Sequence, residues 1–315
     1  MLINRRDFPG SDPYTERELA TLASLQSAPN ALDLIQQFMT DRARELYDFL
    51  VKFIAQEDIP LSYGSAGGLI LAGWSFGNTW ITSFLQQLAH FPVTDIDLRG
   101  YLRRIVLYDP PCHSVGVASP ETKYDPFEDE TIPLLERPEA FNKWVTGYFT
   151  HGESAETLEL RTPAAEPRPS ILSITQEELV RAFHPGPAGP EGSDRLLVLA
   201  GIASGLNRIM KEEGFYPEGE DPWKHVEVRY LWCSQSVYEG PWGAWALRKE
   251  LEEANKAGRR TRNINVVCLR GANHFVSPLC GLSLCLDLTY LLQAHWDIPD
   301  RLLRAFLINE ETAKL

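Results

Sequence analysis

The sequence lacks the long apolar runs of a membrane protein and the paired cysteines of a zinc site. The longest apolar stretch, residues 278–293, is interrupted by Asp287 and is expected to form a buried helix. Charges and Pro9 occupy the segment where a secretory signal would have its apolar core. We therefore expect a reduced, cytoplasmic protein with no membrane span and no bound metal. The cysteines are scattered, without a C-x-x-C pair: Cys112, Cys233, Cys268, Cys280 and Cys285.

Basic residues are also in the minority. The chain has 30 lysines and arginines against 43 aspartates and glutamates, a formal net charge of −13. Such a charge repels nucleic-acid phosphates and anionic lipids, so we expect neither as a partner. Hydrophobic residues make up 44% of the 315 residues and charged residues 23%. These values are typical of a folded, water-soluble protein with a large core.

Strand and helix patterns alternate along most of the chain. Residues 12–56 carry apolar positions at helical spacing. Short apolar runs predict strands at residues 68–73, 104–108, 226–233 and 264–269, and helical patterns follow at 78–90, 242–257 and 279–294. Strands that alternate with helices predict an α/β fold, with a parallel sheet covered by helices on both faces.

A long segment interrupts this alternation. Residues 112–224 are too many for a loop, and we expect them to form a helical lid inserted into a core of residues 1–111 and 225–315. Helical patterns occur in the insert at residues 138–148, 175–183 and 195–213. Its middle part, residues 163–194, is rich in proline and glycine, which predicts mobility rather than packed structure.

The strongest chemical signal is a G-x-S-x-G motif formed by Gly73, Trp74, Ser75, Phe76 and Gly77. It stands directly between an expected buried strand and an expected helix. Such a turn strains the serine backbone and exposes its hydroxyl above the sheet, and the two glycines are expected to remove Cβ atoms that would collide. Ser75 is therefore the expected nucleophile. The backbone N–H of Phe76, at the positive end of the following helix, is the expected oxyanion donor.

His274 is the expected general base. An unassisted serine hydroxyl is a poor nucleophile, so a base must lie within hydrogen-bonding distance of it. His274 directly follows the last expected strand, which ends at Leu269, and none of the other six histidines has that position.

Two residues compete for the role of the acid that orients His274. Asp109 stands at the end of the strand next along the chain from the nucleophile, where a carboxylate would stabilise the imidazolium. Glu239 is the first carboxylate after the strand that ends at Cys233. We favour Asp109, although Asp109 followed by Pro110 is also a common way to begin a turn.

Four motifs resemble those of the α/β-hydrolase superfamily. They are Asn-Arg-Arg-Asp-Phe-Pro-Gly-Ser at residues 4–11, Gly-Trp-Ser-Phe-Gly-Asn at 73–78, Tyr-Asp-Pro-Pro at 108–111 and Gly-Ala-Asn-His-Phe at 271–275. Their local sequence is similar to that of a fungal branch associated with secondary-metabolite pathways. The resemblance implies an α/β-hydrolase fold and an esterase, thioesterase or acyltransferase that releases or cyclises polyketide-like acyl chains.

The chain departs from the superfamily at its N-terminus. In the superfamily several strands precede the segment that residues 2–11 resemble, and a loop after one of them supplies a second oxyanion donor. The chain therefore resembles a shortened member, and we expect weak activity or a replacement donor from the loop at residues 6–11. A sheet edge left unpaired in this way also predicts a tendency to form homo-oligomers.

The sequence leaves three functions open. The first is acyl transfer through Ser75 and His274 on an ester, thioester or lactone of an apolar acyl chain, free or bound to a carrier, without any metal or organic cofactor. The second is a catalytically weak or inactive protein of the same fold that binds a small apolar ligand. The third is a lyase or cyclase that uses the same pocket without a covalent serine.

Overall fold

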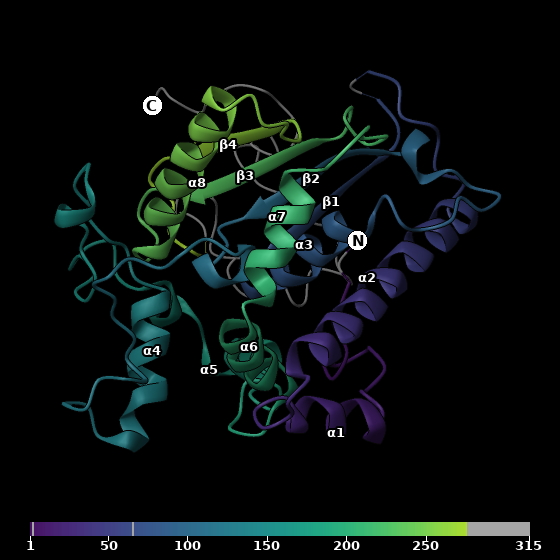
Figure 1. Cartoon of the computed structure of the whole chain (residues 1–315). Helices are drawn as coiled ribbons and strands as arrows, with labels where there is room; N and C mark the ends of the chain where they lie inside the picture. Colours follow the sequence, from purple (N-terminus) through teal and green to yellow (C-terminus); the bar gives the residue numbers. More distant parts are fainter. Residues whose placement is uncertain (2, 65, 276–315) are drawn as a thin grey trace.

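A parallel sheet forms the centre of the molecule (Figure 1). The computed structural model describes residues 1, 3–64 and 66–275. The helix predicted at residues 279–294 and the cysteines at 280 and 285 lie outside the described residues. The sheet contains the four predicted strands, in the order β1 (Leu69–Trp74), β2 (Leu102–Tyr108), β3 (Glu227–Cys233) and β4 (Ile264–Leu269).

The parallel order of the strands decides where the functional residues lie. Each strand pairs with the next along the chain, with Trp74 opposite Tyr108 and Cys233 opposite Leu269. All four carboxyl ends therefore meet at one edge of the sheet. Residues that are far apart in sequence, such as 75, 109 and 274, reach that edge from different strands.

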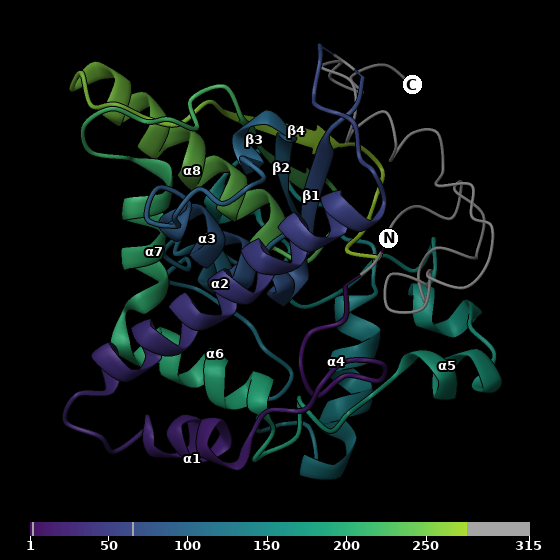
Figure 2. The same ribbon diagram turned by 90° about the vertical axis from the view of Figure 1, so that its right-hand side faces the viewer.

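Helices pack against one face of the sheet. The strands lie in the sheet in the same order as in the chain. Because crossovers between parallel strands are right-handed, the connecting helices then lie on the same face of the sheet. Accordingly α3 (Asn78–Gln87) and α8 (Glu239–Lys256) share one apolar cluster with α2 (Ala31–Gln56), and Figure 2 shows these helices gathered on one side of the strands.

The opposite face of the sheet is apolar too. Strand alternation directs Val106, Tyr108, Leu231 and Leu269 away from the main cluster, and they form a smaller one of their own. The predicted α/β fold with a parallel sheet is confirmed, and within the described residues helices cover one of its faces. None of the described helices is long and apolar enough to cross a membrane.

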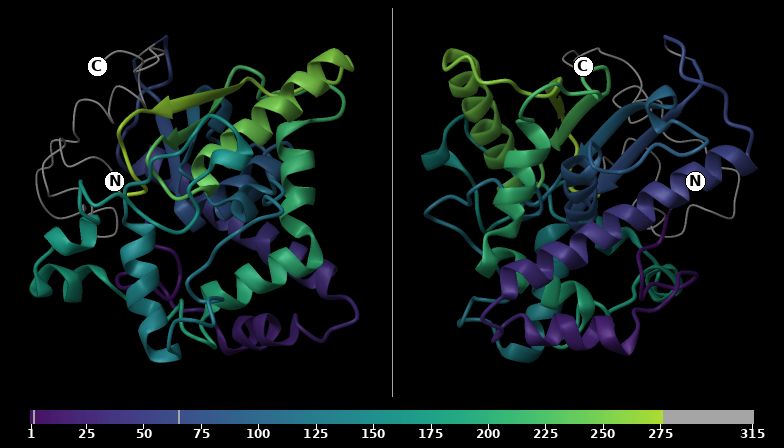
Figure 3. Two further views of the ribbon diagram at one scale, coloured as in Figure 1. Left: turned by 90° about the vertical axis from the view of Figure 1, so that its left-hand side faces the viewer. Right: turned by 45° about the vertical axis from the view of Figure 1, so that its right-hand side comes forward.

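A third apolar cluster lies beside the sheet, between the N-terminal helices and the insert. Helix α1 (Glu16–Ser24) begins at a capping box, in which Thr15 and Glu18 satisfy each other's backbone N–H groups. It packs against α6 (Ser193–Ser204) of the insert, and Figure 3 shows the two helices side by side. The insert therefore contacts the N-terminal helices as well as the sheet domain.

The insert contains helices at each of its three expected helical patterns. Before the insert, the short helix η2 (Leu98–Gly100) precedes β2. The insert itself contains η3 (Cys112–Val115), η4 (Leu134–Glu136), α4 (Arg137–Val145), η5 (Ala155–Thr157), η6 (Ser170–Ser173), α5 (Gln176–Ala182), α6 and α7 (Leu206–Phe215).

One prediction for the insert is wrong. The pattern at residues 195–213 forms two helices rather than one, because Gly205 adopts a φ of 73° that ends α6 and begins α7. The proline-rich part at residues 163–194 contains η6 and also α5, which matches the helical pattern expected at 175–183, and its mobility stays a prediction. Ser170 within it is only 8% exposed.

Candidate active site

Ser75 occupies a strained turn at the end of β1. Its φ is 51°, a left-handed conformation that side chains other than glycine rarely adopt. The short helix η1 (Ser75–Gly77) runs directly into α3. The buried side chain of Asn78 holds this turn, because its amide donates to the carbonyl oxygens of Ser75 at 2.8 Å and Tyr108 at 3.1 Å. The serine is thus tied to the ends of both β1 and β2.

The two glycines of the motif differ in their surroundings. A Cβ atom at Gly73 would lie 2.5 Å from the side chain of Ile81 and 2.9 Å from that of Asn78. A Cβ atom at Gly77 would meet no described atom within 4 Å. The expectation that both glycines prevent collisions is therefore wrong for Gly77. Only Gly73 allows α3 to pack closely on the strand.

His274 joins the expected nucleophile to the expected acid. Its Nε2 lies 2.9 Å from Oγ of Ser75, and its Nδ1 lies 2.7 Å from Oδ2 of Asp109. Since the carboxylate can only accept, Nδ1 carries the proton and Nε2 is left to accept from the serine hydroxyl. His274 is 4% exposed and Asp109 is 2% exposed. Three residues from three strand ends therefore form one buried hydrogen-bonded chain.

The carboxylate of Asp109 receives hydrogen bonds at both oxygens. Oδ1 accepts from the backbone N–H of Cys233 at 2.9 Å, and Oδ2 accepts from the hydroxyl of Ser236 at 2.6 Å as well as from His274. The backbone N–H of Asp109 donates to the carbonyl of Leu231 at 2.7 Å, which supports its positive φ of 41°. These bonds hold the carboxylate in one orientation, directed at the imidazole.

The side chains of Trp74 and Asn273 hold the loop that carries His274. The indole N–H of Trp74 donates to the carbonyl of His274 at 3.0 Å, and the two rings lie 5.2 Å apart. The amide of Asn273 donates to the carbonyl of Thr146 at 2.8 Å and to the hydroxyl of Ser170 at 2.9 Å. The base is therefore held both by the strand that carries the nucleophile and by the insert.

Glu239 does not occupy the acid position. It is the first residue of α8, and the hydrogen bond to Nδ1 of His274 comes from Asp109. Burial raises the pKa of the Glu239 carboxyl to about 7, although a hydrogen bond from the backbone N–H of Cys112 acts in the opposite direction. Glu239 is thus a second acidic group near the chain of Ser75, His274 and Asp109, but it is not part of that chain.

Phe76 lies where its backbone N–H is available to a ligand at Ser75. It is the second residue of η1, where a short helix leaves its N–H groups without intrahelical partners. The side chain of Phe76 points away into the third cluster, between the N-terminal helices and the insert, with its ring 5.3 Å from that of Trp80. The ring of His113 is 6.1 Å away, and burial lowers the pKa of His113 to about 4, so this imidazole is neutral.

The N-terminal loop approaches the same region through Arg5. The guanidinium carbon of Arg5 lies 5.3 Å from the ring of Phe76, 4.5 Å from Trp80 and 4.9 Å from Phe8, and the group forms a 2.6 Å ion pair with Asp194 of the insert. Arg5 therefore connects the N-terminal loop, the residue after Ser75 and the insert.

The loop at residues 6–11 uses several of its N–H groups internally. Those of Asp7, Phe8 and Ser11 donate to the carbonyls of Asp12, Arg5 and Phe8. These three groups are therefore engaged within the loop. A replacement oxyanion donor from this loop has to come from its other residues.

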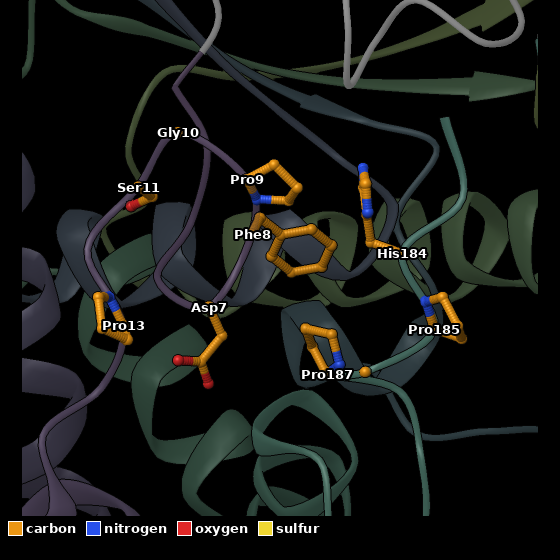
Figure 4. Close-up of a pocket in the computed structure, with 10 residues that line it drawn as sticks. Asp7, Phe8, Pro9, Gly10, Ser11, Pro13, His184, Pro185 and Pro187 are labelled. Atoms are coloured by element: carbon orange, nitrogen blue, oxygen red, sulfur yellow. The ribbon is translucent and has the colours of Figure 1, made fainter. Parts of the chain in front are cut away.

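An open pocket of about 400 Å³ lies between this loop and the insert (Figure 4). The ring of Phe8 lines it, and the same ring contacts Arg5, which in turn contacts Phe76. The lining comes from two segments and includes Asp7, Phe8, Pro9, Gly10, Ser11, Pro13, His184, Pro185, Gly186 and Pro187. Its lining combines the rings of Phe8 and four prolines with polar groups, among them Asp7, Ser11 and His184.

Within the described part of the chain, no three histidine, cysteine or acidic side chains are grouped so that they would hold a metal ion. Cys112, Cys233 and Cys268 are free thiols. Burial raises the pKa of the first two well above the usual value, so they are not reactive thiolates.

The sequence interpretation did not single out three residues that support the hydrogen bonds between Ser75, His274 and Asp109: Asn78, Ser236 and Asn273. Each is a small polar residue directly after a strand or next to a motif residue, and each is buried in the structure. Polar residues at the carboxyl ends of parallel strands were the available signal.

Comparison with protein-family models, with curated proteins and with solved structures finds no match to this chain.

Proposed function

We propose that this protein is a serine hydrolase or acyltransferase of the α/β-hydrolase type. The observation that carries the proposal is the continuous chain from Ser75 Oγ through His274 to Asp109, with distances of 2.9 Å and 2.7 Å. The strained turn at Ser75, directly before α3, supports the same proposal. Nucleophile, base and acid in this relation are the arrangement by which a serine becomes reactive near neutral pH.

The proposed reaction is acyl transfer in two steps. Ser75 Oγ attacks the carbonyl carbon of an ester, thioester or lactone while its proton passes to Nε2 of His274. His274 then gives this proton to the leaving oxygen or sulfur as the bond to carbon breaks, and an acyl-serine ester remains. A water molecule or a hydroxyl of the substrate repeats the sequence and releases an acid or a lactone. Asp109 stays ionised throughout and stabilises the imidazolium.

The proposed oxyanion donor is the backbone N–H of Phe76. It lies next to the nucleophile at the N-terminal end of α3, where the helix dipole also favours a developing negative charge. One donor of this kind contributes a factor of roughly 10² to 10³ in rate. A second donor is expected from the substrate-bound state of the N-terminal loop, outside the N–H groups that the loop already uses.

The proposed substrate class is an apolar acyl compound, free or attached to a carrier. The pocket beside Phe8 offers the rings of Phe8 and four prolines, against which a hydrocarbon chain can pack, beside polar groups such as Asp7 and His184. Arg5 and Phe76 connect this pocket to the turn of the nucleophile. A preference for longer acyl chains is therefore part of the proposal.

The test uses a fluorophosphonate probe, which reacts with activated serines. Intact-mass measurement on the full chain is expected to show one adduct for the wild type and none for Ser75→Ala or His274→Ala. Asp109→Asn is expected to slow labelling by about 10⁴-fold, because the imidazole then loses the partner that selects its tautomer. Hydrolysis of p-nitrophenyl esters of increasing chain length then reports the acyl preference.

The alternative function has its own outcome in this experiment. A folded wild type that does not react with the probe contradicts the proposed enzyme and favours a non-catalytic protein that binds a small apolar ligand. Turnover of a substrate that survives in Ser75→Ala would instead favour a lyase or cyclase without a covalent serine.

A further inference from the structure

One short segment of the insert contacts the loop that carries the proposed base and the loop that carries Ser236, a hydrogen-bond partner of the proposed acid. We propose that residues 146–151 hold His274 and Asp109 in register, and that Asn273 and Ser236 are the positioning residues through which they do so. The proposal rests on the proposed function. It assigns to this part of the insert a role in the catalytic geometry, in addition to that of a cover over a pocket.

The link to the base runs through Asn273. Its side-chain amide is completely buried and donates to the carbonyl of Thr146 and to the hydroxyl of Ser170, while its own oxygen accepts from the backbone N–H of Phe275 at 3.0 Å. Asn273 directly precedes His274. Its three hydrogen bonds therefore hold the backbone on both sides of the imidazole against the insert.

The link to the acid runs through Ser236. Its hydroxyl is completely buried and donates to Oδ2 of Asp109, the same oxygen that receives the N–H of His274. Its carbonyl accepts from Nε2 of His151 at 2.7 Å. The tautomer of His151 follows from its other nitrogen, which accepts from the backbone N–H of Glu159 at 3.2 Å. His151 therefore stays neutral in this arrangement, with its proton on Nε2.

Two further contacts hold the segment in place between these links. The backbone N–H of Phe149 donates to the carbonyl of Gln235 at 3.0 Å. Trp144 and Phe149 also form a buried apolar cluster with Val237 and Tyr238, the residues that follow Ser236. The insert segment is therefore packed on the β3–α8 loop and hydrogen-bonded to the β4 loop at the same time. A shift of this segment would move acid and base relative to each other.

The acid link is tested with variants that differ in one hydroxyl. Ser236→Thr and Ser236→Val have side chains of equal size, so any strain from the added methyl group is common to both. We expect Ser236→Val to lower the labelling rate and kcat by about 10-fold to 100-fold, with KM nearly unchanged, because a poorly placed group costs turnover rather than binding. Ser236→Thr is expected to recover most of the loss, because it keeps the donor to Asp109.

The insert links are tested with Asn273→Ala and His151→Gln. Both are expected to lower kcat about 10-fold at temperatures where thermal unfolding shows a folded protein. His225→Gln is the matched control, because His225 also directs Nε2 at a backbone carbonyl, that of Arg99, but lies before β3 at the opposite edge of the sheet. Its activity is expected to equal that of the wild type.

The outcomes separate this inference from the function on which it rests. A wild type that does not react with the probe contradicts the proposed function and this inference with it. A wild type that reacts, together with equal rates for the Thr and Val variants and an unchanged His151→Gln, overturns this inference alone. If Asn273→Ala does not fold, the Ser236 pair and His151→Gln still decide, because each retains most of the packing of the site.

Discussion

Backbone strain in the described part of the chain coincides with the proposed chemistry. Four non-glycine residues there have a positive φ, and two of them are Ser75 and Asp109. Such conformations cost roughly 1–3 kcal/mol each and persist only where the surroundings hold them. The amide of Asn78 holds Ser75, the bond to Leu231 holds the backbone of Asp109, and the N–H of Cys233 holds its carboxylate. The strain presents both side chains to His274 from adjacent strands.

The two glycines of the serine turn are expected to respond differently to alanine. Gly73→Ala places a methyl group 2.5 Å from Ile81, which has to move, and we expect a loss of about 1–3 kcal/mol in unfolding free energy. Gly77→Ala is expected to change stability by less than about 0.5 kcal/mol. Urea unfolding of both variants measures this. Equal losses would contradict the view that only Gly73 is needed for close packing.

At the scale of elements, the turn after β1 depends on its attachment to β2. The amide of Asn78, at the start of α3, is the group that joins the carbonyl of Ser75 to that of Tyr108. Residue 78 must supply the donor for both hydrogen bonds, because each partner is a carbonyl oxygen, which can only accept. The side chain is completely buried, so water cannot replace it.

Asn78→Asp is therefore expected to destabilise the protein by at least about 2 kcal/mol, because it replaces a buried donor with a carboxylate that faces two carbonyl oxygens. The labelling rate at Ser75 is expected to fall as well. Asn4→Asp is the control, because Asn4 also donates to a backbone carbonyl, that of Pro9, but at the surface. A stability loss as small as that of the control would show that the amide does not hold the turn.

At the scale of the whole molecule, acidic side chains from separate segments act on the carboxyl group of Glu239. The net charge is −13, and Asp125 and Asp109 both raise the pKa of Glu239 further after burial has raised it. The folded state therefore binds the Glu239 proton more tightly than the unfolded state does. The stability that this proton contributes is fully present below pH 4.5 and is lost as the pH rises through about 7.

Glu239→Gln removes this dependence on pH. We expect the variant to gain stability over the wild type at pH 8 relative to pH 5, by at most about 3 kcal/mol for a pKa raised from 4.5 to about 7. Thermal unfolding at the two pH values measures the difference. Glu252→Gln, an exposed position on the same helix, is the control. A stability difference that does not vary with pH would contradict the burial of an ionisable Glu239.

The interpretation of the sequence succeeded where a signal was local. The apolar runs of the four strands, and the positions of Ser75 and His274 after two of them, depend on neighbouring residues alone. Parallel strands bring their carboxyl ends to one edge, so the meeting of these residues follows from the strand pattern. The expected cytoplasmic location, homo-oligomer and polyketide-like substrate stay predictions, because they depend on surfaces and ligands beyond that pattern.

The tertiary structure decided what depends on contacts between distant segments. Asp109 and His274 are 165 residues apart in the sequence. The sequence pattern alone shows both Asp109 and Glu239 as acidic residues after strands, and only the packing selects Asp109 as the partner of His274. The support of the base and acid by Asn273 and Ser236 depends on how the insert packs on the sheet domain, which its predicted helical patterns do not specify. A local pattern specifies which element a residue belongs to, whereas a buried hydrogen bond depends on which elements pack against it.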